Sequence, residues 1–172
     1  HRIKHYLDFL DSSLLIRAIK PHEIRLKKKK GYDKLCLCDH AIRSAWLQEI
    51  IPLDPAKLDA APHLYDLAGH IAESIAGYLL ASLPNLDIAH LPERSDAPEV
   101  DFIAIIGEHR IPIEIKYRGR IDEPHDTRGL NVFIEKKVNN APFGLLVTRN
   151  YESEVSDPKI ICVPLKTLLI VR

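Results

Sequence analysis

The chain of 172 residues carries 24 Lys and Arg against 24 Asp and Glu, so its formal net charge is zero, and 46% of its residues are hydrophobic. This length and composition are those of a globular protein with one sizeable core, or with a main domain and a small attachment. We expect no membrane-spanning segment and no secretory leader, because no apolar run approaches about 20 residues and no signal-peptide pattern occurs.

Charge and cysteine are unevenly distributed along the chain. Residues 1–60 hold 12 Lys and Arg against 8 acids, whereas residues 61–100 hold 1 against 6. Three cysteines, two of them in the segment Cys36-Leu37-Cys38, do not form an even disulfide framework, so we expect a reducing, cytoplasmic location. Because the chain begins at His1 and contains no Met, we expect it to be a fragment of a longer protein.

The first 45 residues are predicted to form a winged-helix-like α+β segment. Apolar residues recur at helical spacing over residues 2–11, and strand-like runs follow at 14–19 and 34–38. A helix followed by a two-stranded wing is typical of the end of a winged-helix domain. A basic run lies between the two strands; it suggests phosphate contacts, although adjacent lysines more often form a solvated loop. The predicted nucleic-acid-binding residues are Lys27, Lys28, Lys29 and Lys30.

Cys36, Cys38 and His40 alternate along one face of the second predicted strand. They could begin a zinc site, but a partner pair with recognised spacing is absent, so buried small thiols are the favoured interpretation. A connector containing two prolines is predicted at residues 46–61. It separates the first segment, residues 1–45, from a main domain at residues 62–172.

The longest predicted helix covers residues 64–83, between Pro62 in its first turn and Pro84 after its end. A flank of small side chains that would let a sheet approach closely contains Gly69, Ala72 and Ala76. Glu73 lies at the edge of the polar stripe beside this flank. His70 is interpreted as a solvated residue of the same stripe, although it could also pair with Glu73.

A β-hairpin follows the helix. Residues 100–106 and 111–117 are rich in β-branched and aromatic side chains, and residues 107–110 form a turn-like break between them. We therefore predict two antiparallel strands around a short turn.

Three charged residues are predicted to share one face of this hairpin. If the turn has an even number of loop residues, Asp101 lies opposite Lys116 and Ile103 lies opposite Glu114. Because side chains alternate along a strand, Asp101, Glu114 and Lys116 then project from the same side.

The rest of the chain is predicted to complete a sheet. A polar segment over residues 118–128 is interpreted as a mobile surface loop. A weak helix is predicted over residues 129–139, buried strands over 143–147 and 159–164, and a short helix or edge strand over 165–171. The order hairpin, helix, strand, strand is typical of an α/β domain with a mixed central sheet.

The charged face of the hairpin requires a further cation. Ile103 shares that face, which is mostly apolar, so the charges are half buried. Two carboxylates beside a single lysine would cost roughly several kcal/mol per unpaired ion. A divalent metal held by carboxylate oxygens is the natural candidate. The alternative is a strand salt bridge of Lys116 with Asp101 or Glu114, satisfied without metal.

The helix LAGHIAESIAGYLL, the strand EVDF and the sequence Glu114-Ile115-Lys116 resemble the PD-(D/E)xK nuclease-like superfamily, which has the restriction-endonuclease fold. With YLDFLDSSLL and KLCLCDHAIRSA in front, nearly the whole chain resembles the C-terminal domain of unknown function found behind an AAA-type ATPase domain in many bacterial and archaeal proteins. The resemblance implies an α/β fold, with a restriction-endonuclease-like mixed central sheet flanked by helices and a small winged-helix-like segment in front.

The resemblance also implies a magnesium-dependent nuclease that hydrolyses DNA or, as a less favoured substrate, RNA. Asp101 and Glu114 would bind Mg²⁺ or Mn²⁺, and Glu73 would complete or support the metal site. Lys116 would orient or help to deprotonate the attacking water, or stabilise charge on the scissile phosphate.

Two other classes of function stay open. One is a non-catalytic module that holds nucleic acid or a protein partner for the attached ATPase. The other is a structural dimerisation domain that forms a homo-oligomer, which no feature of the sequence favours or opposes. ATP binding would belong to an upstream domain, because the phosphate-loop pattern G-x-x-x-x-G-K-[ST] does not occur in this chain.

Overall fold

The computed structural model describes residues 2–22, 32–52, 54–93, 98–150 and 154–170. In chain order, the first elements are α1 (Arg2–Ser12), β1 (Ile16–Ile19), β2 (Lys34–Leu37), α2 (His40–Leu47), α3 (Pro55–Asp59), the 3-10 helix η1 (Pro62–Leu64) and α4 (Tyr65–Ser82). They are followed by β3 (Asp87–Leu91), β4 (Val100–Ile106), β5 (His109–Lys116), α5 (Glu123–Asp126), α6 (Arg128–Glu135), the 3-10 helix η2 (Lys137–Asn139), β6 (Gly144–Thr148), β7 (Ile160–Pro164) and α7 (Leu165–Leu168).

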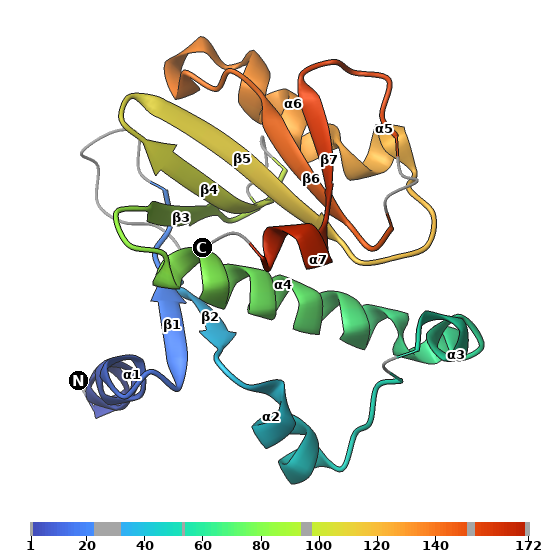
Figure 1. The fold of residues 1–172 in the computed structure, drawn as a ribbon. Coiled ribbons are helices and arrows are strands. Elements are labelled where there is room, and N and C mark those ends of the chain that lie inside the picture. The colour runs from blue at the N-terminus through green and yellow to red at the C-terminus, as the bar shows by residue number, and fades with distance from the viewer. Residues whose placement is uncertain (1, 23–31, 53, 94–97, 151–153, 171–172) are drawn as a thin grey trace.

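Two sheets form the framework (Figure 1). β1 and β2 pair as an antiparallel two-stranded sheet. The central sheet has the order β3-β4-β5-β6-β7, antiparallel from β3 to β5 and parallel from β5 to β7. Helices α4 and α7 lie against one face of the central sheet, and α6 lies against the other (Figure 1). The predicted α/β fold with a mixed central sheet is confirmed.

The hairpin register differs from the prediction by two residues. Ile106 pairs with His109 and Phe102 pairs with Ile113, so the loop consists of Gly107 and Glu108 alone. Gly107 has a φ of +59°, the left-handed conformation that tight hairpin turns require and that glycine adopts freely. Continuing this register by one residue brings Asp101 opposite Glu114 instead of Lys116. Because the shift is even, the side chains keep their predicted faces.

Helix α4 packs on the central sheet through its flank of small residues. The buried residues of the helix are Ala68, Ala72, Ala76, Gly77 and Leu80. Ala72 and Ala76 of the predicted small-residue flank are buried, but the glycine at the close approach is Gly77 and not Gly69, where an added Cβ would meet nothing within 4 Å. Phe102 of β4 and Cys36 of β2 both reach the helix at Gly77. The Cys36 thiol is buried, which raises its pKa to about 12, so it packs as an uncharged group.

Gly77→Ala tests this close approach. An added Cβ would lie 2.5 Å from Cys36 Sγ and 2.6 Å from Phe102 Cζ. We expect a net loss of about 1 kcal/mol in the free energy of unfolding, because the overpacking outweighs the gain in helix propensity. Gly69→Ala in the same helix is the matched control, since its Cβ would meet nothing within 4 Å, and should stabilise by about 0.5–1 kcal/mol. Urea unfolding of both variants measures the difference, and equal effects would contradict the packing described.

The N-terminal sheet is joined to the central sheet. His22 N–H donates to His90 O at 2.7 Å, and His90 N–H donates to Lys20 O at 3.1 Å, beside β3. Ile19 and Cys36 belong to the same buried cluster as α4 and the central sheet. The predicted helix and two strands of the first segment are present. The division into residues 1–45, 46–61 and 62–172 stays a prediction, and Lys27, Lys28, Lys29 and Lys30 lie outside the described residues.

The segment over residues 118–128 is more ordered than the surface loop expected from its polar composition. It contains α5, and the side chain of Asp126 is buried. Arg118 pairs with this carboxylate, and the Asp122 amide donates to it at 2.8 Å. Composition suggested solvent exposure because a buried ion pair cannot be recognised before both partners are placed.

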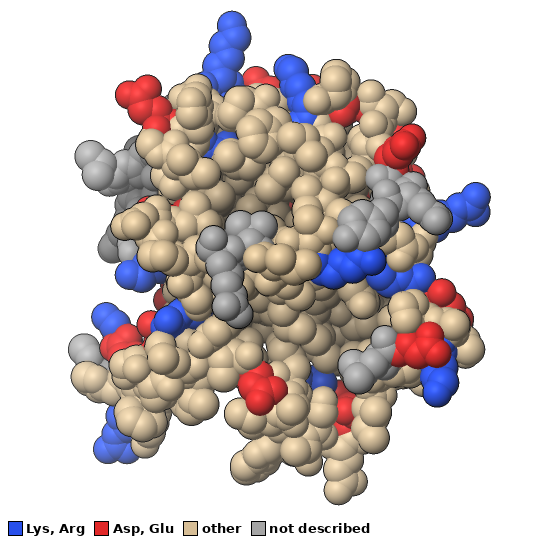
Figure 2. All heavy atoms as spheres, viewed as in Figure 1, with Lys and Arg blue, Asp and Glu red and all other residues tan. Residues whose placement is uncertain are grey.

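Helices α1 and α2 have no buried residues. Several of their apolar side chains are exposed, including Tyr6 and Phe9 of α1 and Trp46 of α2. In Figure 2, the part of the surface formed by α2 is mostly uncharged. Among the described helices, none has both the length and the apolar character needed to cross a membrane.

Candidate functional site

The site begins where β4 and β5 stop pairing. The last backbone pair of the hairpin is Phe102 with Ile113, and Asp101 lies one residue beyond it. The Asp101 carboxylate takes the place of a backbone carbonyl of the facing strand, since its Oδ2 accepts from Ile115 N–H at 2.9 Å. Asp101 is only 8% exposed. This bond fixes the carboxylate between the two strands, with Oδ1 left to bind another group.

Lys34 supplies the cation that contacts Asp101. Its Nζ lies 2.6 Å from Glu73 Oε1, 3.1 Å from Glu99 Oε1 and 3.3 Å from Asp101 Oδ1. Lys34 is the first residue of β2, Glu73 comes from the middle of α4, and Glu99 directly precedes β4. Two segments that are distant in sequence from β2 therefore place their carboxylates around the ammonium of Lys34.

Glu114 and Lys116 form the second ion pair, as neighbours on the same face of β5. Lys116 Nζ donates to Glu114 Oε1 at 2.7 Å. Glu114 is 8% exposed, and its Oε2 has no hydrogen-bond partner among the described residues. Gly129 of α6 lies against this carboxylate and against the backbone oxygen of Glu99, where a Cβ would be only 2.5 Å from that oxygen. Because Gly129 has no side chain, α6 can pack closely against Glu99 and Glu114.

Two acids of the network, Glu114 and Glu73, hold protons more tightly than usual. Burial and the charge of Asp101 raise the pKa of Glu114 to about 7, although Lys116 opposes the shift. Burial and Asp101 also raise the pKa of Glu73, against the effect of Lys34. In this network of described residues, four carboxylates share two ammonium groups. The negative charge is therefore only partly compensated.

Both lysines stay charged at neutral pH. Burial lowers the pKa of Lys34, but Asp101 and Glu73 raise it by more. Burial likewise lowers the pKa of Lys116, and Glu114 raises it by more. Each side chain therefore acts here as a cation and not as a proton acceptor.

The predicted catalytic and metal-binding residues line one open cavity of about 430 Å³. Glu73, Asp101, Glu114 and Lys116 are all part of its wall, together with Arg118. His70 also lies at this cavity, but its side chain is 80% exposed and its Nδ1 is 4.0 Å from Glu73 Oε2. The solvated interpretation of His70 agrees with this position.

The donor set fits a hard divalent cation by its chemistry. The acids offer carboxylate oxygens only, carry uncompensated charge, and include the buried and unpartnered Glu114 Oε2. The side-chain positions are those of a salt-bridge network. Among the described residues, no group of three or more His, Cys, Asp or Glu is arranged to hold a metal ion. Cys36, Cys38 and His40, the residues of the possible zinc site, are described and form no such group.

Sequence reasoning missed Lys34 and Glu99. Strand periodicity could have indicated the face on which each of them lies, because Lys34 is two residues from the buried Cys36 and Glu99 is two residues from Asp101. Strand alternation puts both on the same side as those partners. The pairing of Lys34 with these acids could not be read from the sequence, because it depends on how β2 packs against α4.

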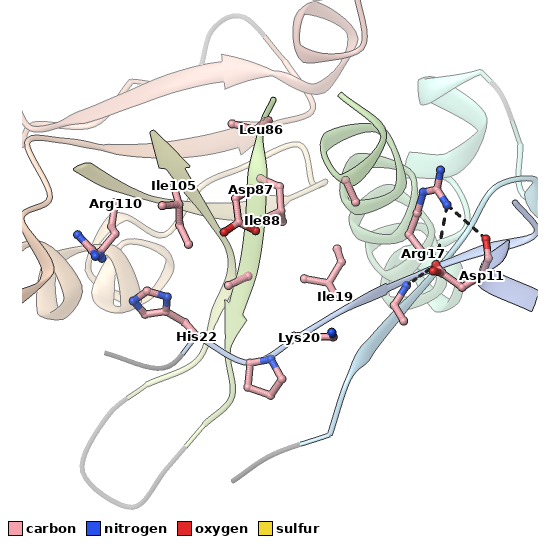
Figure 3. A pocket seen from close by; sticks show the side chains of 14 residues that line it. Asp11, Arg17, Ile19, Lys20, His22, Leu86, Asp87, Ile88, Ile105 and Arg110 are labelled. Carbon is pink, nitrogen blue, oxygen red and sulfur yellow. Dashed lines mark hydrogen bonds and ion pairs between the residues drawn. The ribbon is translucent and has the colours of Figure 1, made fainter. Parts of the chain in front are cut away.

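A second cavity of about 770 Å³ lies between β1 and β3 (Figure 3). Asp11 and Arg17 pair on one side of it, and Asp87 and Arg110 lie farther along it. Burial and the charge of Arg110 lower the pKa of His22, which also lines it. Among the described residues, the wall of this cavity carries charges of both signs, which give it no clear preference for a ligand, and Glu73, Asp101, Glu114 and Lys116 are not part of it.

Comparison with protein families gives a match. Neither the curated proteins nor the solved structures gave a match. A family model described as a domain of unknown function (DUF4143) matches residues 68–168, more than half of the chain. Domains of this family are typically associated with AAA-type ATPases. The matched region runs from α4 to α7 and contains the central sheet with Glu73, Asp101, Glu114 and Lys116. The chain belongs to this family of domains of unknown function, DUF4143.

Proposed function

We propose that the chain is a nuclease-like domain of an AAA-type ATPase, with a PD-(D/E)xK site that hydrolyses DNA phosphodiester bonds. One observation carries the proposal. Asp101, Glu114 and Lys116 meet at the point where β4 and β5 diverge, in an open cavity that also contains Glu73. Buried carboxylates at such a position cost free energy, so their presence at an open cavity favours a role in binding or catalysis.

Asp101 and Glu114 would hold Mg²⁺ or Mn²⁺, and Glu73 would support the site from α4. When bound, such an ion supplies activated water and offsets the charge of a phosphate. The contribution of the chain itself is to hold the carboxylates in place, through Ile115 N–H for Asp101 and Lys116 for Glu114. The open cavity leaves room for a phosphate beside Lys116.

Lys116 would stabilise negative charge on the phosphate. The resemblance left this role open beside that of a general base. Its ammonium lies 2.7 Å from Glu114 Oε1 with 26% of the side chain exposed, so it reaches the cavity while remaining paired. A cation already oriented by a carboxylate needs little reorganisation when charge develops on a neighbouring oxygen.

A non-catalytic module of the same ATPase is the second candidate, and Lys34 is the observation that favours it. Its ammonium already pairs with Glu73, Glu99 and Asp101 without a metal. In this role the domain would hold nucleic acid or a protein partner. On the face seen in Figure 2, Lys and Arg are interspersed with Asp and Glu and do not form one broad basic patch. On this face, that distribution favours a local contact over an extended electrostatic one.

A cleavage assay tests the catalytic proposal. The 172-residue chain is incubated with plasmid and with single-stranded DNA, with Mg²⁺, with Mn²⁺ and with a chelator. We expect metal-dependent cleavage by the wild type that falls at least about 100-fold in Glu114→Gln and in Lys116→Met, because each removes a charge from the reacting centre. Glu108→Gln, an exposed acid in the hairpin turn, is the matched control and should cleave like the wild type.

Two outcomes would overturn the catalytic proposal. One is cleavage at the same rate by the wild type and by both site variants, which would indicate a contaminating nuclease. The other is no cleavage with any of the metals. If DNA binding persists in the absence of cleavage, the non-catalytic module is favoured.

A further inference from the structure

The ammonium of Lys34 occupies the point on which three carboxylates converge. Glu73, Glu99 and Asp101 each direct one oxygen at Nζ, at 2.6, 3.1 and 3.3 Å. The Lys34 side chain is only 15% exposed, so the contact is largely screened from solvent. A surface lysine that pairs transiently with one acid does not have this geometry.

The fold builds this contact through β2. Leu37 N–H donates to Ser74 Oγ of α4 at 2.9 Å, and Cys36 packs against Gly77 one turn further along the same helix. Lys34 alternates in phase with Cys36 and therefore faces the helix and the sheet. Its Nζ also lies 5.2 Å from the centre of the Phe102 ring, a cation–π distance. The strand is thus docked in a position that delivers one amine to the acids.

We propose that Lys34 is the resident cation of this carboxylate cluster and that a divalent metal ion binds there only by displacing its ammonium. An ion held by Asp101 and Glu114 needs Asp101 Oδ1, because Oδ2 already accepts from Ile115 N–H. Support from the helix acid needs Glu73 Oε1, and Lys34 occupies both of these oxygens. The two cations cannot share them, because an ion bound at about 2.0–2.6 Å from those oxygens would lie in strongly repulsive contact with the ammonium. The proposal rests on the proposed function for the kind of cation involved.

Displacement does not require β2 to leave its place. A lysine side chain has four rotatable bonds, so its ammonium can turn away while Leu37 and Cys36 hold the strand on α4. The exposed Glu99, at 49%, lies on the open side of the cluster and offers an outer position for the released amine. The site therefore has two states, one closed by Lys34 and one open to a metal ion.

Metal binding measures the competition without using activity. Mn²⁺ affinity is determined by electron paramagnetic resonance of the free ion, for the wild type, Lys34→Met, Lys34→Arg and Lys136→Met. We expect Lys34→Met to bind Mn²⁺ at least about tenfold more tightly than the wild type, a usual size for coupling between two ligands. Lys34→Arg keeps a competing cation and should stay close to the wild type. Lys136→Met, an exposed lysine that follows α6, should also leave the affinity unchanged.

The rise in melting temperature on adding Mn²⁺ is a second readout, and it should be larger for Lys34→Met than for the wild type. If Lys34→Met does not fold without metal, Lys34→Gln takes its place. Equal Mn²⁺ affinity in the wild type and Lys34→Met would overturn the proposal, as would no binding by either protein, or tight binding by Lys34→Arg. DNA cleavage with unchanged affinities would overturn the competition alone. A gain in affinity without cleavage would overturn the nuclease function alone.

Discussion

The Asp126→Ala variant is expected to lose about 2–4 kcal/mol of the free energy of unfolding, because it breaks a buried charged network. Asp126 is 1% exposed, pairs with Arg118 and accepts from the Asp122 amide at 2.8 Å. The side chain of Arg118 is 42% exposed, so water can hydrate its guanidinium group once the partner is removed. The loss of stability is therefore smaller than for a fully buried ion pair. Urea unfolding at pH 7 measures the change.

Asp122→Ala is the matched control for this prediction. Asp122 precedes α5 and uses its backbone N–H toward Asp126, but its side chain makes no capping hydrogen bond. We expect its removal to change stability by less than about 0.5 kcal/mol. A loss in Asp126→Ala as small as that in Asp122→Ala would show that the buried pair contributes nothing.

The contribution of Asp126 should also depend on pH. Burial alone would raise the pKa of Asp126, but hydrogen bonds from Arg118 and from the Asp122 amide lower it by more. An acid with a lowered pKa stabilises the fold at pH values above its unfolded pKa, and this stabilisation is lost as the pH falls through the folded pKa. The difference between the wild type and Asp126→Ala should therefore shrink in acid.

Glu114→Gln is expected to remove a pH dependence of opposite sign, worth about 2 kcal/mol between pH 8 and pH 5. The pKa of Glu114 is about 7 in the folded chain, against an ordinary 4.5. Between these values the folded state binds a proton that the unfolded state does not, so the wild type gains stability from this group as the pH falls from 8 to 5. Glutamine cannot titrate, so Glu114→Gln should lack this gain.

The measurement compares urea unfolding of the two proteins at both pH values. Relative to the wild type, Glu114→Gln should be more stable at pH 8 than at pH 5. Glu135→Gln, an exposed acid at the end of α6, is the control and should follow the wild type at both. Parallel pH profiles for Glu114→Gln and the wild type would mean that Glu114 is not held in an unfavourable charged state.

Local patterns in the sequence were sufficient for much of the fold. Strand composition and the small-residue flank of α4 predicted the hairpin, the long helix and their close packing. Alternation put Asp101, Glu114 and Lys116 on one face, and that result survived an error of two residues in register because only the parity mattered. The turn length was wrong because two-residue and four-residue loops satisfy the same strand composition.

The sequence by itself therefore determined which side chains of one hairpin share a face, since backbone geometry repeats every two residues along a strand. Only the tertiary structure decided that Lys34 is the cation that pairs with Asp101 and Glu73. Lys34 is 67 residues from Asp101 and 39 residues from Glu73, and it reaches both because β2 packs on α4 through Cys36 and Gly77. Such a contact depends on the packing of separate elements, which local periodicity does not encode. The ion pair of Arg118 with Asp126 likewise depends on where the fold places both residues, so it could not be predicted in a segment that composition alone assigns to the surface.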